Sequence, residues 1–516
     1  MNDYPIQPQF QQQTPPARRL GPSVQPYLPQ RDHKKRNLII LISVIVAVTL
    51  LAGILWFFYT HSASYRIGKG LMKLSKEAEA LKNPMDEKLG TEALCRMFFT
   101  EGGEVDSKLN VTFDTFLGEV TLGVDTDYGK DMGEKELSSS TAFSVMNYEF
   151  GHLDVYADRE NVCFSVPELF LEDLYVENED VLAQYNRSLW AQDWLFGEVR
   201  GDDFSIDLFS APWYITDEEG AGKAFLNRYA MEIDSCRRYM VMEKAGRDLY
   251  RVRFEGSSFN ALVRQVLSDY LHDHLQYPQS YRESILGIMS CFDPGSGPEE
   301  ISFLLEMDEK DTIESIRFEH PVSLGRGAIS LDGDVYFLGG ENSLEKMQGR
   351  IFFDNKESET GREREIVWQV VRSLEQGEYR MESEAKYSFL QNDVKHTVKL
   401  EGDFDYDGPK NSFQAKASAD IQGTEFAVET SGDFSHIKKG ESFDLELDEV
   451  RFLTDGEQTM LVRGEIDLAP LSGRVKQYVE PKNAVFAMGE DDWGRILEKI
   501  DREYGYLWEI AGDYLW

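Results

Sequence analysis

The chain has 516 residues, with 92 Asp and Glu against 54 Lys and Arg, and a formal net charge of −38 at pH 7. A negative charge of this size repels nucleic-acid phosphates and anionic lipid headgroups, which argues against a nucleic-acid-binding protein. The partners that remain are cations, neutral polymers, apolar ligands and basic protein surfaces.

Residues 1–37 are rich in Gln and Pro and contain few aliphatic side chains. Such a segment cannot bury enough apolar surface to offset the entropy lost on ordering. We expect a disordered tail on the cytoplasmic side of a membrane.

Residues 38–59 form a stretch of 22 residues without a charged side chain. A helix of that length, at about 1.5 Å per residue, spans a hydrocarbon core of about 30 Å. The basic residues before it favour a cytoplasmic N-terminus; they are Arg31, Lys34, Lys35 and Arg36. We therefore expect a single-pass signal anchor in the cell membrane, with the body outside the cytoplasm. A signal peptide cleaved near residues 62–64 is the alternative, although its apolar core would be unusually long.

Residues 60–85 are predicted to form a helical stalk, with a helix from about Tyr65 to Lys82. Its apolar residues alternate at spacings of four and three; they are Ile67, Leu71, Leu74, Ala78 and Leu81. Two heptads are fewer than the three to four that indicate a coiled coil. We expect an amphipathic helix packed on the body, with a homodimer through the stalk as the alternative.

Residues 86–345 are predicted to form an α+β extracytoplasmic domain. From Ser107 onward, apolar residues alternate with polar ones in short runs separated by polar turns. This pattern indicates an antiparallel sheet with one solvated face. Two amphipathic helices, at about 218–245 and 257–274, interrupt the strands.

Residues 346–516 are predicted to form a β-meander that ends in a helix from Asp492 to about Trp508. One side of that helix carries Trp493, Ile496, Ile500, Tyr504 and Leu507, and we expect it to cover an open face of a sheet. The predicted fold class is α+β, with one N-terminal transmembrane helix followed by antiparallel amphipathic β-sheets packed with a few helices.

The order of these segments resembles a known class of protein. A single anchor followed by sheets and helices, with the strand-like run Glu160-Asn161-Val162-Cys163-Phe164-Ser165-Val166-Pro167, is similar to uncharacterised membrane-anchored envelope proteins of Gram-positive bacteria. Residues 107–320 also loosely resemble lipoprotein-carrier domains that hold acyl chains, although the lipobox cysteine of that family is absent. The resemblance implies an apolar groove and assigns no residue a role.

The four cysteines leave their redox state open; they are Cys95, Cys163, Cys236 and Cys291. Four cysteines allow three pairings, and their spacing does not choose among them. An oxidising compartment favours two disulfides. The position of Cys236 on an apolar helical stripe favours buried free thiols instead.

One short motif suggests a metal site. Asp403, Asp405 and Asp407, followed by Gly408, match the start of a calcium-binding loop. Gln414 occupies the position of the bidentate Glu, and the flanking segments are strands. The same residues occur on the wet face of a strand that enters a turn. We predict a hairpin without an ion, and calcium at these three carboxylates is the alternative.

No other catalytic or cofactor-binding motif was found, so no cofactor is expected. The function predicted from the sequence is that of a non-catalytic envelope protein, anchored in the membrane, whose body binds an apolar ligand or an envelope protein. A cell-wall-directed hydrolase and a transmembrane sensor are the alternatives.

Overall fold

The computed structural model describes residues 63–115, 118–145, 148–168, 172–188, 191, 197–199, 205–211, 213–216, 221–273, 279–356, 363–391, 394–487 and 502. The expected tail, the apolar stretch at 38–59 and, apart from Arg502, the expected C-terminal helix lie outside these residues.

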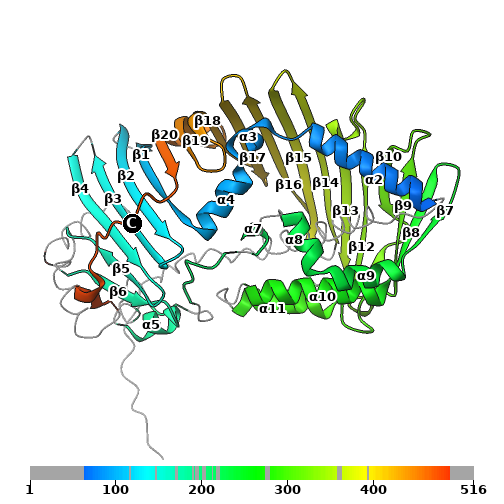
Figure 1. Ribbon diagram of the computed structural model, residues 1–516, viewed down its shortest axis with the longest axis horizontal. Coiled ribbons are helices and arrows are strands. Elements are labelled where there is room, and N and C mark those ends of the chain that lie inside the picture. Colours follow the sequence, from blue (N-terminus) through cyan, green and yellow to red (C-terminus); the bar gives the residue numbers. More distant parts are fainter. Residues whose placement is uncertain are drawn as a thin grey trace, which may run out of the picture. The chain divides into compact units, whose positions relative to one another are not determined.

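The described strands belong to one sheet (Figure 1). Its largest part is a meander in which each strand pairs antiparallel with the next. These strands are β12 (Ile329–Phe337), β13 (Lys346–Asn355), β14 (Glu363–Glu375), β15 (Glu378–Gln391), β16 (Val394–Asp407), β17 (Ser412–Ile421), β18 (Thr424–Lys438), β19 (Ser442–Thr454) and β20 (Glu457–Ala469).

The N-terminal strands continue the same sheet because β20 pairs antiparallel with β1. From there the order runs through β1 (Gly102–Thr115), β2 (Gly118–Asp131), β3 (Glu136–Val145), β4 (Tyr148–Ala157), β5 (Asn161–Ser165) and β6 (Leu174–Glu177). The short strand β21 (Val485–Phe486) pairs parallel with β6.

On its other side, the meander continues from β12 to the strands of the middle of the chain. Strand β12 pairs with β10 (Ile313–Phe318) and with the short β11 (Val322–Leu324). Beyond β10 lie β9 (Glu300–Met307), β8 (Leu249–Glu255) and β7 (Val241–Lys244), each antiparallel to its neighbour.

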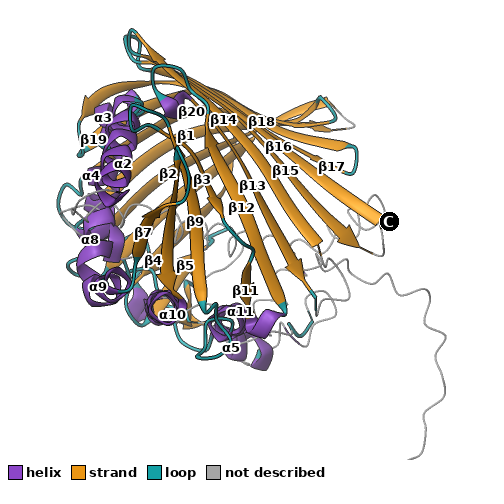
Figure 2. Ribbon diagram, turned by 90° about the vertical axis from the view of Figure 1, so that its right-hand side faces the viewer, coloured by secondary structure: helices purple, strands orange, loops and turns teal. Residues whose placement is uncertain are grey.

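Tight turns keep neighbouring strands of the meander in register (Figure 2). Three of the hairpins have two-residue turns, at Gln376-Gly377, Gln422-Gly423 and Asp455-Gly456, and both residues of each turn have positive φ. Paired positive φ angles define the turn type whose twist matches that of antiparallel strands, and Gly adopts such angles without steric cost.

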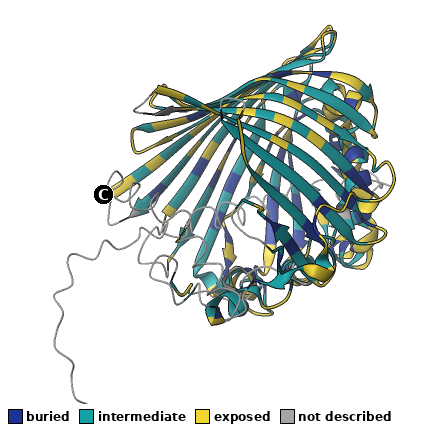
Figure 3. Cartoon of the chain, turned by 90° about the vertical axis from the view of Figure 1, so that its left-hand side faces the viewer, coloured by how far each residue is buried: buried dark blue, intermediate teal, exposed yellow. Residues whose placement is uncertain are grey.

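Strict alternation gives the sheet one apolar and one polar face. Tyr379, Tyr406 and Phe413 lie opposite one another on β15, β16 and β17 and belong to the apolar face. Their neighbour Asp405 lies opposite Arg380 on the polar face. Burial alternates accordingly from Gly402 to Tyr406 of β16, and Figure 3 shows buried and exposed residues in succession along the strands.

The described helices are α2 (Ala63–Ala80), α3 (Pro84–Leu89), α4 (Thr91–Thr100), α5 (Val181–Arg187), α7 (Trp213–Thr216), α8 (Ala221–Arg228), α9 (Ala230–Arg238), α10 (Gly256–Asp273) and α11 (Gln279–Ser290), with single 3-10 turns at η2 (Gly325–Gly327), η3 (Ser343–Glu345) and η4 (Pro481–Asn483). The helix expected at about 65–82 is confirmed as α2, which packs on the sheet through the buried Ile67 and Leu71. Gly70 allows a close approach, because a Cβ there would lie 2.6 Å from Met307 Cε.

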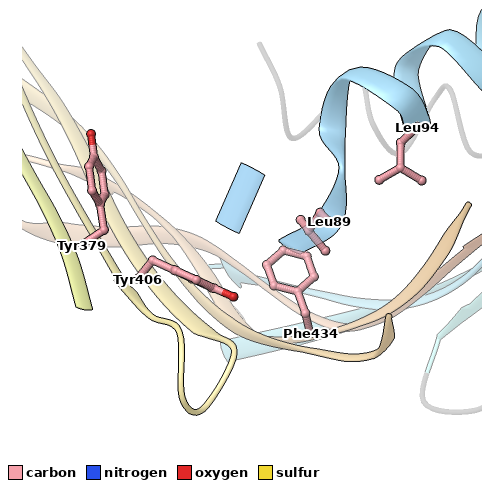
Figure 4. Packing of buried hydrophobic residues seen from close by; sticks show 5 residues of the cluster. All are labelled: Leu89, Leu94, Tyr379, Tyr406 and Phe434. Atoms are coloured by element: carbon pink, nitrogen blue, oxygen red, sulfur yellow. The ribbon is translucent and has the colours of Figure 1, made fainter. Parts of the chain in front are cut away.

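Helices α3 and α4 cover part of the apolar face (Figure 4). Leu89 and Leu94 form a buried cluster with Tyr379, Tyr406 and Phe434 of the meander. The backbone N–H of Gly440, in the β18–β19 turn, donates to the carbonyl of Leu89 at 2.8 Å, which ties the end of α3 to the sheet.

The expected fold class is wrong. Instead of several sheets packed with helices, the described strands form one continuous antiparallel sheet with 21 strands, apart from the parallel β6–β21 pair. The sequence pattern did not reveal this because the decisive pairing, β20 with β1, joins residues more than 340 positions apart. Among the described helices, none is long and apolar enough to span a membrane. The domain boundaries proposed from the sequence stay a prediction.

Candidate binding groove

After β20 the chain crosses the polar face of the N-terminal strands before it reaches β6. Ser472 donates through its hydroxyl to Glu104 at 3.1 Å, and Lys476 forms an ion pair with Asp127. Farther along, Val479 is buried with Tyr156 and Cys163. We call residues 470–480 the crossing segment, and it forms one wall of a surface groove.

The groove lies on the polar face of β20, β1, β2 and β3 and has a volume of about 440 Å³. Its lining is dominated by carboxylates, which are Asp106, Asp125, Asp127, Glu465 and Asp467. Lys108 and His152 are the basic side chains that line it. The sheet therefore presents a depression with an excess of negative charge.

The pairing register explains why so many carboxylates meet there. Asp444, Asp467, Asp106 and Asp127 lie directly opposite one another on β19, β20, β1 and β2. Neighbouring strands are about 4.8 Å apart, and like charges placed opposite each other destabilise a sheet. This row therefore costs folding free energy unless cations compensate it.

Only part of the row is compensated within the described chain. Asp127 pairs with Lys476, and Asp444 lies 2.5 Å from His436 Nδ1, an imidazole that is a cation only when it is protonated. Among the residues that the structure describes, no ion pair reaches Asp106 or Asp467. Burial, together with the neighbouring carboxylates of Asp444, Glu465 and Asp106, raises the pKa of Asp467.

At the two sides of the groove, aromatic and imidazole groups contact carboxylates. Burial and a hydrogen bond with Asp127 raise the pKa of Tyr478 to about 12. His152 Nδ1 lies 3.0 Å from Glu168, whose other oxygen accepts from the His152 backbone N–H. The hydrogen bond to Glu168 and the nearby Glu149 raise the pKa of His152.

A second depression, of about 280 Å³, lies over β12 to β15 and includes Trp368 in its lining. Its charges are matched, since Arg350 pairs with Asp334 at 3.2 Å and Lys386 with Glu384 at 3.1 Å. It therefore lacks the unbalanced charge of the first groove, which we take as the candidate site.

The residues singled out for calcium lie elsewhere, on the polar face of β16. Asp405 is 3.5 Å from Arg380, Asp407 is 2.6 Å from Lys410, and Asp403 lies opposite Lys416. Alternate residues of a strand are about 6.6–7 Å apart, so these carboxylates do not converge. In the described part of the chain, no group of three or more metal-ligating side chains is placed to hold an ion.

The groove cannot be recognised in the sequence, because its carboxylates come from strands at opposite ends of the chain. The available signal was the pair of acidic residues separated by one position, at Asp125 and Asp127 and at Glu465 and Asp467. That alternation is also what any solvated strand face shows, so register was needed to interpret it.

The four cysteines are free thiols in the structure. Cys163 and Cys236 are buried, and burial raises the pKa of each thiol to about 11. A thiol with so high a pKa is a poor nucleophile at neutral pH. These two side chains therefore serve packing.

Comparison with known proteins gave no family model and no curated protein that matches the chain. Among solved structures, a porin triple mutant from Rhodopseudomonas blastica is 6% identical, with 71% of this chain and 98% of that chain covered and a TM-score of 0.22. An anion-selective porin from Comamonas acidovorans is 9% identical, with 71% and 97% covered and a TM-score of 0.23. The outer membrane protein OpdK from Pseudomonas aeruginosa is 6% identical, with 72% and 100% covered and a TM-score of 0.17.

These findings correct several expectations from the sequence. The neighbours are porins rather than Gram-positive single-pass envelope proteins or lipoprotein carriers, and no described helix is long and apolar enough to span a membrane. Three expectations are therefore wrong. The first is the resemblance to those proteins, and the second is the single-pass signal anchor with a cytoplasmic N-terminus and an extracytoplasmic body. The third is the set of partners expected of that arrangement, including a homodimer through the stalk. At such low TM-scores the likeness transfers no function to this chain.

Proposed function

We propose that the protein is a membrane-associated binding protein whose groove on β20, β1, β2 and β3 binds an organic cation with several amino or guanidinium groups. A Lys- and Arg-rich peptide segment and a free polyamine share this chemistry. The observation that supports the proposal is the row of directly opposed aspartates, two of which lack an ion-pair partner among the described residues.

The spacing of the carboxylates favours several cationic groups over one metal ion. Oxygen ligands of Ca²⁺ must converge to about 2.3–2.6 Å from one ion, and in the described part of the chain no group of three or more metal-ligating side chains is placed to do so. Ammonium groups on a flexible chain can each approach one carboxylate. A bound cation would also lower the raised pKa of Asp467, because it stabilises the ionised form.

The test is the binding of a fluorescein-labelled octalysine peptide to the full-length protein in detergent, measured by fluorescence anisotropy. The double variant Asp106→Asn with Asp467→Asn should weaken binding about 5- to 30-fold, because each partly exposed ion pair is worth about 0.5–1 kcal/mol. Unlabelled spermine competes if the groove binds free polyamines, and it leaves the peptide bound if a longer basic segment is required.

A matched variant, Asp403→Asn with Asp405→Asn, removes the same charge from the polar face of β16. It should leave the affinity within about twofold. Equal weakening in the two double variants would show that the peptide senses only the overall charge, and the proposal would then be wrong.

A further inference from the structure

The apolar face of the sheet remains partly uncovered at the N-terminal strands. At the start of β4, Tyr148 is 82% exposed and Phe150 is 56% exposed. Phe150 lies 6.4 Å from the ring of Phe143. The pairing of β4 with β3 shifts by one residue at Phe150, so Leu153 and Val155, although an odd number of residues farther on, continue the same face. We call these five residues the β4 patch.

A contiguous apolar surface of this kind on a folded protein marks a site that another apolar surface covers. Around Tyr406 the apolar face has such a cover, since α3 and α4 pack on that cluster, whereas Leu400, Ile421 and Phe426 farther along the meander are 37%, 45% and 47% exposed. In the part of the chain that the structure describes, the exposed end of the β4 patch has no comparable cover.

We propose that the C-terminal segment, residues 492–508, covers the β4 patch as an amphipathic helix. Its sequence supplies the matching surface, with five apolar side chains spaced three or four residues apart: Trp493, Ile496, Ile500, Tyr504 and Leu507. Arg502, the residue of this stretch that the structure describes, is helical and exposed, and it lies between those apolar positions.

The described chain stops on the same face of the sheet as the patch. Ala487 follows β21 and donates its backbone N–H to Tyr175 of β6 at 2.7 Å. Its side chain has the same orientation as that of Val485, which lies opposite the buried Leu174. Leu174 pairs with Phe164, and Phe164 pairs with Val155 of the patch. The chain therefore leaves β21 with a side chain on the apolar face.

The dimensions also agree. From β21 to β4 there are three strand spacings, or about 14 Å. Tyr175 pairs with Cys163, and Cys163 pairs with Tyr156, so Tyr175 and Tyr156 lie at the same height along their strands. Tyr156 lies six residues, or about 20 Å, from Phe150 along β4. The diagonal is about 24 Å, and a 17-residue helix is about 26 Å long. Because β21, β6 and β4 run in the same direction, the chain leaves β21 toward the Ala157 end of β4, and the proposal requires residues 488–491 to reverse it. A helix of residues 492–508 that then runs back across the sheet is long enough to reach Phe150.

The test is photo-crosslinking in the full-length protein with p-benzoylphenylalanine in place of Phe150. Mass spectrometry should identify intramolecular crosslinks to peptides from residues 492–508. The same probe in place of Asp154, on the polar face of β4, should give none to that segment. Crosslinks to a second copy, to detergent or lipid, or to other parts of the chain alone would overturn the proposal.

Two variants of the segment separate docking from mere proximity. Ile496→Glu with Ile500→Glu should remove the crosslink and speed hydrogen exchange of β4 amides at least fivefold, because it places charge on the apolar side. Arg495→Glu changes the other side of the helix and should keep both values within twofold of the wild type. A crosslink that survives the double Glu variant would also contradict the proposal.

Discussion

Asp311 connects α2 to the turn between β9 and β10, and its charge should hold the helix in place. The carboxylate pairs with Arg66 and, at 2.7 Å, with Lys69. Arg66 also donates to the Tyr250 hydroxyl at 2.7 Å and to the Asp308 carbonyl at 2.8 Å. We predict that Asp311→Asn releases α2 while the sheet stays folded.

The magnitude follows from the burial of the pair. Loss of one partner of a fully buried ion pair costs about 3–5 kcal/mol, whereas exposed pairs contribute less than about 1 kcal/mol. The side chain of Asp311 is 12% exposed and that of Arg66 is 29% exposed, so we expect a loss of about 1–3 kcal/mol. In hydrogen exchange this corresponds to about 5- to 150-fold faster exchange of α2 amides.

The pH dependence has a definite sign. Burial alone would raise the pKa of Asp311, but hydrogen bonds from Lys69 and Arg66 outweigh it, and the pKa is lowered. A carboxyl with a lowered pKa stabilises the fold above its unfolded-state pKa of about 3.9, and the contribution is lost as the pH falls through the folded-state pKa. Exchange of wild-type α2 should therefore approach that of Asp311→Asn only in strong acid.

The matched control is Glu309→Gln in the same turn, because the Glu309 side chain is 88% exposed. It should leave α2 exchange unchanged. If Asp311→Asn also leaves α2 exchange unchanged at neutral pH, the ion pairs do not hold the helix and the reasoning is refuted.

Three further predictions concern the sheet. Gly464→Ala should lower the free energy of unfolding by more than about 2 kcal/mol in chemical denaturation, because its φ is 152° and a Cβ would lie 1.9 Å from a backbone oxygen of β1. The control Gly151→Ala should cost less than about 1 kcal/mol, because no atom lies within 4 Å of the added Cβ. Lys130 is 5% exposed, and burial lowers its pKa. The free energy of unfolding of the wild type should therefore rise as the pH passes from the folded-state pKa of Lys130 toward the unfolded value of about 10.4. If the difference in free energy of unfolding between the wild type and Lys130→Met does not change over that range, this prediction is contradicted. The raised pKa of His152 should stabilise the fold below about pH 6.5 and lose this effect as the pH rises through the folded-state value, and NMR titration should show that Glu168→Gln lowers that pKa.

The sequence predicts local structure in this chain well where one period dominates. The alternation in β16 appears in the structure as two faces of one strand, with Phe404 half-buried and Tyr406 buried while Asp403 and Asp405 are exposed. The stripe that includes Ile67 gave helix α2 for the same reason. Local periodicity suffices there because each residue's environment is set by its own element.

Strand order could not be predicted, because period-two segments do not specify their partners. The pairing of Asp106 with Asp467 joins the N-terminal strands to the end of the meander. Both residues are ordinary wet-face aspartates in the sequence, and only the pairing makes them neighbours. The candidate groove was therefore not visible before the fold, while the more conspicuous Asp403 motif lies on a strand face beside Lys416.

Carboxyl footprinting tests the central claim most directly. Asp and Glu side chains of the full-length protein would be labelled with a carbodiimide and glycine ethyl ester, with and without octalysine, and labelling would be quantified by mass spectrometry. The account predicts that octalysine protects Asp106 and Asp467 at least threefold while Asp403 and Asp405 label as before. Equal protection of all four residues, or no protection of the first two, would contradict a cation-binding groove on β20 and β1.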